Sequence, residues 1–265
     1  MSRFKKMLPL AFLFLGLFVV FGPQNVSAVG LLSPDNTSLL PGISLEVGAT
    51  DDPQSVVATL QVLFLISLIT LAPSLLVLLT GFTRIIIVMA FTRQATATQQ
   101  MPPNQVLVGI AIFLTLFIMA PQFSAISRNA IDPLGAGEID LPTAIAEAWE
   151  PIEEFMTRQL SNSSGLNAVT LFSDLAGETL VMNEPIPPRI LIPAFILNEL
   201  SMAFLMGFII YLPFIVIDMV VASVLMSMGM MMLPPAMISM PFKVMVFILS
   251  GGWGFVIENM LKTFQ

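Results

Sequence analysis

Few side chains in this sequence could take part in chemistry. The 265 residues include no cysteine and no histidine, which excludes thiolate and imidazole catalysis and the zinc, haem and iron–sulfur sites that depend on these residues. What remains is a set of charged side chains in or beside strongly apolar sequence: Arg84, Arg93, Glu199, Asp218 and Lys243. An acid at the centre of a membrane helix costs roughly 2.5 to 3.5 kcal/mol on insertion scales, so we expect these groups to be paired or to face protein or water.

A run of methionines follows Asp218 and is the second candidate site. The window from Pro213 to Pro241 holds eight of the chain's 19 methionines. Methionine is flexible and polarizable, so a cluster of it suits a deformable seal, although a Met-rich membrane helix could equally pack as core. Gly229 and the pair Pro234–Pro235 break a helix and favour a turn or loop. The candidate gate consists of Met226, Met228, Met230, Met231 and Met232.

The composition places these residues in a membrane. Hydrophobic residues make up 56% of the chain and charged residues 10%, and the mean hydropathy is +0.92, well beyond soluble domains. We predict an all-α integral membrane protein of kinked helical hairpins. The sequence contains no paired catalytic aspartates, Ser–Lys arrangement, nucleotide-binding loop or metal cluster. It therefore predicts neither an enzyme nor a cofactor or metal site.

The chain begins with segments that precede the apolar helices. Residues 1–28 have a basic start, an apolar run and small residues at the end, and we interpret them as a secretory signal cleaved after Ala28, with an uncleaved anchor as the alternative. Residues 29–55 are rich in Ser, Pro, Gly and Asp and predict a flexible periplasmic lead-in. Residues 56–121 predict a first apolar helical hairpin, bent near Pro73.

A hydrophilic segment, residues 122–189, separates the first hairpin from the rest. We expect it to be an acidic periplasmic helical region. Within it, Leu141 to Leu160 predicts an amphipathic helix. The apolar residues at helical spacing are Ile145, Ala148, Trp149, Ile152, Phe155 and Met156. The acids opposite them are interpreted as a solvated face.

Residues 190–265 predict C-terminal apolar hairpins with the Met-rich loop between them. Helix breaks are expected at Pro213, Pro234–Pro235 and Pro241. Glu199, Ala203 and Gly207 recur at every fourth residue, so one helix face combines a carboxylate with small residues that let another backbone approach. Too few Arg and Lys residues lie nearby in the sequence to pair every acid. This shortage predicts an oligomer or a hetero-complex.

Residues 213–230 read PFIVIDMVVASVLMSMGM and resemble the signature of the FliP family, the flagellar biosynthetic proteins and their injectisome relatives in type III secretion. Motifs similar to the family's first hairpin occur upstream, at Thr70–Ser74, Phe82–Ile85, Arg93–Ala95, Thr98–Gln100 and Pro102–Leu107. Pro241–Lys243 and Gly252–Trp253 resemble its final segment. The likeness covers most of the chain.

The chain departs from the family pattern at a few positions. The second family signature corresponds to residues 193–208, where the pattern has a basic residue near Ser201 and a polar one at Leu205. An acid is usual where Gly251 stands. If those polar groups pair with neighbouring subunits, this chain has rewired or lost such pairs.

The resemblance implies a core component of the flagellar type III protein export gate. By this resemblance several copies, a pentamer by expectation, form a helical ring with the sister subunits FliQ and FliR, next to the membrane subunits FlhA and FlhB. Unfolded flagellar substrates would pass through the centre, and the methionines would line a soft gasket. The expected location is the bacterial inner membrane at the flagellar basal body, with a periplasmic portion. Membrane lipid is an expected partner, and nucleic acid is not.

Two alternatives belong to other classes. A small-solute or ion transporter would use Glu199 and Asp218 as a relay, but the halves of the chain lack the self-similarity that transporters usually show. A structural scaffold would differ from a gate only in whether the methionine loop lines a pore.

Overall fold

The structure is a computed structural model that describes residues 77–98, 101–178, 185–230 and 234–264, together with residues 67, 70, 71 and 74. The chain divides into two compact units, Met1–Leu76 and Val77–Gln265, and the second contains the labelled elements. The predicted signal sequence, its cleavage after Ala28 and the lead-in at 29–55 lie outside the described residues.

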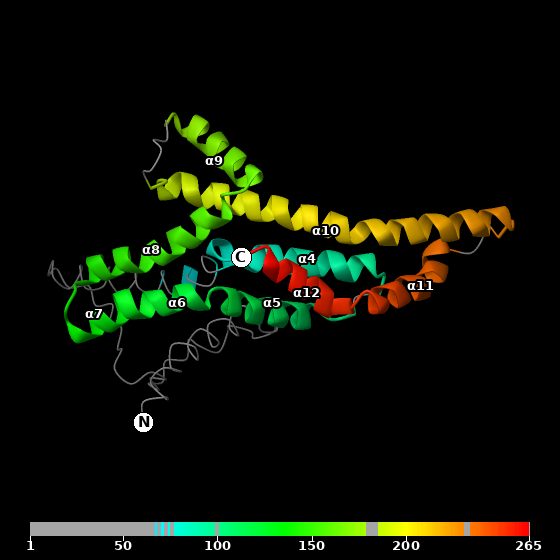
Figure 1. The fold of residues 1–265 in the computed structure, drawn as a ribbon, viewed down its shortest axis with the longest axis horizontal. Coiled ribbons are helices and arrows are strands. Elements are labelled where there is room, and N and C mark those ends of the chain that lie inside the picture. Colours follow the sequence, from blue (N-terminus) through cyan, green and yellow to red (C-terminus); the bar gives the residue numbers. More distant parts are fainter. Residues whose placement is uncertain are drawn as a thin grey trace, which may run out of the picture. The chain divides into compact units, whose positions relative to one another are not determined.

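The second unit is helical throughout its described part, which confirms the all-α prediction (Figure 1). The elements in chain order are α4 (Phe82–Ala95), α5 (Asn104–Ile118), α6 (Ala120–Ile126), the π-helical turn η2 (Ser127–Ile131), α7 (Asp132–Ala136), α8 (Leu141–Gln159), α9 (Ser163–Ala176), α10 (Pro188–Ser227), α11 (Pro235–Leu249) and α12 (Gly252–Lys262).

The long helix α10 organises this unit. At 1.5 Å per residue its length is about 60 Å, twice the roughly 30 Å hydrocarbon core of a bilayer. Its N-terminal half packs on α4, α8 and α9, whereas its C-terminal half forms a hairpin with α11. Burial follows this division, because most of the buried α10 residues lie between Ile190 and Gly207.

The face predicted from the four-residue spacing is the one that contacts α4. Glu199, Ala203 and Gly207 are all buried, which confirms the expected close helix neighbour. A Cβ atom on Gly207 would lie 2.5 Å from Cδ2 of Phe91, so only glycine permits this approach of the two helices. Phe91 also packs edge-on against Phe204, with ring centroids 5.4 Å apart.

The hydrophilic segment folds as helices α8 and α9 after the short elements η2 and α7. Asp140 caps α8 by accepting a hydrogen bond from the backbone N–H of Thr143 at 3.1 Å. Hydrogen bonding from the side chain of Thr143, and then from this backbone N–H, lowers the pKa of Asp140 below its ordinary value of 3.8. The helix confirms the prediction for residues 141–160. Of the residues predicted for its apolar face, Phe155 and Met156 are buried, whereas Ile145 is exposed.

Two of the three predicted proline breaks are wrong. Pro213 lies inside α10 and Pro241 inside α11. In apolar helices a proline removes one hydrogen bond, and the helix continues where neighbouring groups compensate. The break at Pro234–Pro235 is confirmed, because α11 begins at Pro235, where the missing N–H is not needed.

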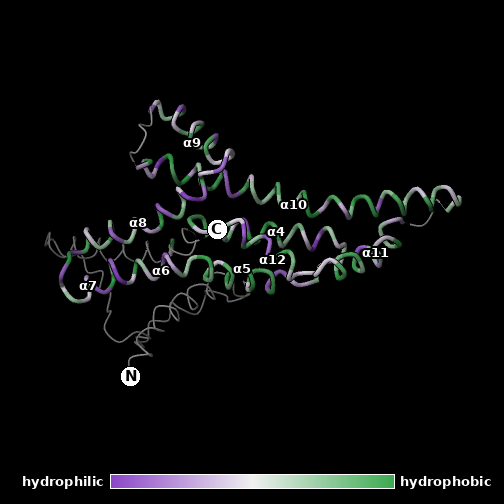
Figure 2. Tube along the Cα trace, viewed as in Figure 1, coloured by the Kyte–Doolittle hydropathy of each residue, from purple (hydrophilic) through white to green (hydrophobic). Residues whose placement is uncertain are grey.

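One described helix, α10, is long and apolar enough to cross a membrane. Two bent pairs would also qualify if each pair were one span: α5 with α6 and α7, bent by 58°, and α11 with α12, bent by 59°. Figure 2 shows hydrophobic residues along most of α10, while hydrophilic residues are frequent in α7 and α8. The described part therefore combines apolar helices with a more polar helical region.

The close contact at Gly207 leads to a stability prediction. Gly207→Ala should destabilise the protein by about 1–3 kcal/mol, because the new methyl group forces the Phe91 ring away from α10. The matched control is Gly109→Ala in α5, where a Cβ would meet nothing within 4 Å. This control should be neutral or slightly stabilising, since alanine favours helix. Thermal unfolding in mild detergent compares the two; equal midpoints would contradict the prediction.

Candidate functional site

Arg84 of α4 is the centre of a buried polar cluster. Both it and Glu199 of α10 are only 1% exposed. Arg84 Nε donates to Glu199 Oε2 at 3.0 Å, and Nη2 donates to Glu199 Oε1 and, at 3.2 Å, to Gln159 Oε1. Nη1 donates to the carbonyl and hydroxyl oxygens of Thr263 at 3.2 and 3.0 Å. Every N–H group of the guanidinium therefore has an acceptor, as a buried charge requires.

Gln159 and Phe264 complete this Arg84 cluster. The ring of Phe264 lies 4.1 Å from Arg84 Cζ, measured to its centroid, and covers the face of the guanidinium. Gln159 Nε2 donates to the Phe264 carbonyl at 3.3 Å, and Asn198 Nδ2 donates to the Gln159 carbonyl at 3.0 Å. The cluster thus joins α4, the end of α8, α10 and the turn that follows α12.

A second polar contact, the Asp218 clasp, ties the far half of α10 to α11. Lys243 Nζ donates to Asp218 Oδ2 at 2.6 Å, and Ser239 Oγ donates to Asp218 Oδ1 at 2.6 Å. Ser239 and Lys243 are four residues apart and so lie on one face of α11. Because the surrounding side chains are mostly apolar, this contact fixes the register of the two helices.

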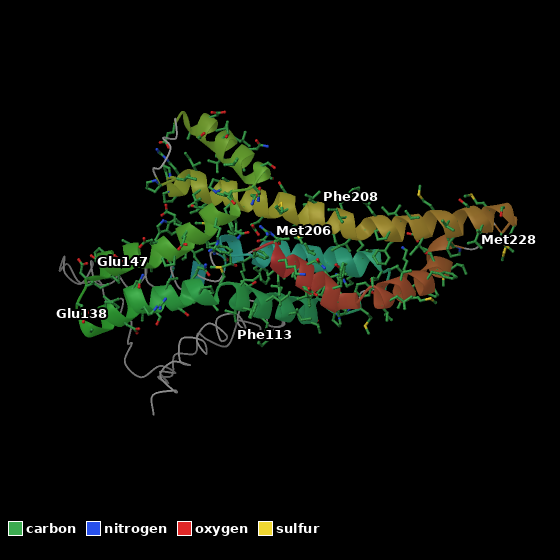
Figure 3. All side chains as sticks on the ribbon, viewed as in Figure 1. Phe113, Glu138, Glu147, Met206, Phe208 and Met228 are labelled. Atoms are coloured by element: carbon green, nitrogen blue, oxygen red, sulfur yellow. The ribbon has the colours of Figure 1, made fainter. Side chains whose placement is uncertain are left out.

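The methionine turn begins where α10 ends, and its described residues are 228–230. Gly229, with φ of 74°, terminates α10. The N–H of Gly229 donates to the Met226 carbonyl, and the N–H of Met230 donates to the Leu225 carbonyl, both at 3.1 Å. This pair of hydrogen bonds is the Schellman motif. The side chains of Met226, Met228 and Met230 are 59%, 66% and 41% exposed. Figure 3 shows Met228 at this end of α10. Met231 and Met232 lie outside the described residues.

Arg93, the remaining candidate, lies apart from both clusters. Its Nη1 donates to Asn104 Oδ1 at 2.6 Å and to the Pro102 carbonyl at 3.2 Å. These contacts connect the end of α4 to the start of α5. Arg93 therefore fastens a turn, and among the described residues it has no salt bridge.

The structure corrects one step of the sequence argument. An assembly was inferred because too few Arg and Lys residues lie near the acids in the sequence to pair every one of them, and the buried charges were assigned to subunit packing. In the structure Arg84 pairs with Glu199, and Lys243 pairs with Asp218, within the chain. The charges are distant in sequence and meet only because α4 and α11 pack on α10. Their presence alone is therefore no reason to infer an assembly.

Several residues of these clusters were missed: Gln159, Asn198, Ser239, Thr263 and Phe264. Only Ser239 carried a usable signal, since it stands four residues before Lys243 and so shares its helix face. The others contribute mostly through backbone carbonyls, an amide or a ring, whose partners depend on the tertiary fold.

The described site is a set of structural contacts. Its acids are held by cations and hydroxyl groups, and no group of three or more possible metal ligands occurs among the described residues. The features define a class: an all-helical, strongly apolar protein with internally paired charges and an exposed methionine turn.

Comparison with known proteins gives the family. The FliP family model matches residues 65–260. The chain is 47% identical over 225 residues to the flagellar biosynthetic protein FliP of Bacillus subtilis, covering 83% of this chain and 98% of that protein. It is 43% identical over 247 residues to the FliP protein of Treponema pallidum (92% and 89% covered) and 41% identical over 240 residues to that of Pectobacterium carotovorum (89% and 91% covered).

The chain belongs to the FliP family. It is therefore a component of flagellar biosynthesis and export, and it is not an enzyme.

Substitutions at Arg84 and Glu199 test whether their ion pair stabilises the fold. Arg84→Met should cost about 3–5 kcal/mol, because it leaves the Glu199 carboxylate buried without a partner. Adding Glu199→Leu removes that unpaired charge, so the double variant should be more stable than Arg84→Met alone. Unfolding of the purified protein in detergent, followed by tryptophan fluorescence, measures both.

The control for this pair is Lys262→Met. Lys262 pairs with Glu258 one turn away on α12, where both side chains are more than half exposed, so its loss should not change stability measurably. An Arg84→Met variant as stable as Lys262→Met would show that the buried pair does not hold the fold.

Proposed function

We propose that this protein is a core component of the flagellar type III protein export gate, and that it forms a gated channel for unfolded flagellar proteins with the sister subunits FliQ and FliR. The channel is a ring of several copies, expected to be five, in the bacterial inner membrane at the flagellar basal body. FlhA and FlhB are the neighbouring membrane subunits. Residues 122–189 of this chain form an acidic helical region on the periplasmic side.

The observation that carries the proposal is the methionine turn at the end of the α10–α11 hairpin. The Schellman end of α10 fixes the backbone, while Met226, Met228 and Met230 project with large exposed fractions. A flexible thioether side chain closes against surfaces of different shape, as a seal around varied unfolded chains requires. Beneath the turn, the Asp218 clasp ties α10 to α11.

The surface of the α10–α11 hairpin supports an assembly in a membrane. Along the C-terminal half of α10 the exposed side chains are large and apolar, among them Leu212, Val216, Val220 and Val224. Such a surface needs lipid or other apolar helices around it. Packing against further copies and sister subunits would cover part of it.

The transporter alternative depended on Glu199 and Asp218 acting as a relay, and their contacts argue against that role. A relay needs carboxylates that exchange protons or ions, but Glu199 is enclosed by the guanidinium of Arg84, and both oxygens of Asp218 accept hydrogen bonds. The contacts of both acids support structural roles.

The assembly is tested by the native mass of the particle. The protein is purified in mild detergent with and without co-expressed FliQ and FliR, and native mass spectrometry measures the complex. We expect a discrete multi-copy particle that includes both partners. A monodisperse monomer or dimer, indifferent to the partners, would contradict the proposed ring.

The gasket is tested by ion leak. Replacing Met228 and Met230 with alanine should increase membrane conductance while the assembled particle remains intact, because shorter side chains leave the closed turn unsealed. The matched control replaces Met219 and Met245, which are similarly exposed but lie inside α10 and α11, about two helical turns or more from the methionine turn. If the two double variants give the same conductance, the methionine turn is not the seal.

A further inference from the structure

The turn after α12 docks into the buried Arg84 cluster. Both hydrogen bonds of Arg84 Nη1 go to Thr263, and the ring of Phe264, only 6% exposed, covers the guanidinium. The ring fits because residue 81 is glycine. A Cβ atom on Gly81 would lie 2.5 Å from Phe264 Cε1 and 2.7 Å from Cζ. The sequence therefore provides a socket for this short segment.

The other end of α12 has the geometry of a hinge. Gly251 and Gly252 adopt φ of 99° and 58°, a backbone region that favours glycine, and α11 and α12 are bent by 59° between them. Between hinge and socket, α12 buries Val256 and Met260 in the core and packs the partly buried Trp253 against it, while residues such as Phe255 remain exposed. The helix is thus fastened mainly along one narrow face and at its last turn.

We propose that α12 with Thr263 and Phe264 is a releasable strap, hinged at Gly251–Gly252 and latched by the Arg84 cluster. Release of the strap leaves the ion pair of Arg84 and Glu199 in place, since Glu199 accepts from Nε and Nη2 and the strap accepts from Nη1. Water can take over the Nη1 hydrogen bonds when the strap leaves. The strap should therefore open without unfolding of the helices around it.

When the strap is closed, it holds the hinge at Gly251–Gly252 in place and therefore also the C-terminal end of α11. This inference concerns the folding of the chain itself and does not depend on the proposed export function.

The absence of cysteine from the chain makes a direct test possible. Three single-cysteine proteins report on separate places: Met260→Cys on the buried face of α12 (0% exposed), Phe255→Cys on its exposed face (56%), and Met89→Cys in the α4 core (0%). Each is purified in detergent and treated with N-ethylmaleimide, and intact-mass measurement gives the labelling rate.

The latch is then weakened in each reporter, either by Phe264→Ala or by Gly81→Ala, which displaces the ring and leaves the residues of α12 unchanged. We expect the rate at Met260→Cys to rise by about tenfold or more, since loss of a buried aromatic contact shifts an opening equilibrium by at least that factor. The rate at Met89→Cys should stay low, and that at Phe255→Cys should not change.

Three results would overturn the proposal. Unchanged labelling at Met260→Cys in both variants would show that the socket does not hold the helix. A parallel rise at Met89→Cys would show that α12 opens only with the whole core. Failure of both variants to fold would likewise show that the last turn belongs to the cooperative core rather than to a separate strap.

Discussion

The buried ion pair between Arg84 and Glu199 is the constraint around which this fold is arranged. Removing two charges from water is costly, and the cost is offset only when every donor of the guanidinium finds an acceptor. Those acceptors come from α8, α10 and the turn after α12, so elements far apart in sequence must converge on one point. A single arginine thereby specifies which helices are neighbours, where apolar packing alone would permit several arrangements.

Beyond this pair, α10 changes its surroundings along its length. The N-terminal half is enclosed by other helices, with Ala203 and Gly207 allowing α4 to approach. The C-terminal half is largely exposed and apolar, with Asp218 held by Lys243 and Ser239 of α11. One continuous helix thus links a protein-enclosed region, where charges are buried in pairs, to an apolar hairpin that ends in the methionine turn.

Patterns that depend on near neighbours in the chain were predictable. The helix of residues 141–159, the glycine turn at Gly229 and the helix start at Pro235 follow from spacing and backbone preference. The predictions of helix breaks at Pro213 and Pro241 were wrong, because a proline inside a helix removes only one backbone hydrogen bond. The apolar residues on both sides favour helix strongly enough for the helix to continue through the proline.

The sequence by itself determined the helical class, the apolar setting, the absence of cysteine and histidine chemistry, and the candidate residues Arg84, Glu199, Asp218 and Lys243. It did not determine their pairing, since a charge distant in the chain has no visible partner until helices pack. Only the tertiary structure decided that Arg84 meets Glu199, that Lys243 meets Asp218, and that Thr263 and Phe264 complete the cluster. The physical reason is that desolvation and hydrogen-bond geometry act between atoms in space, and sequence spacing reports only on neighbours within a few turns.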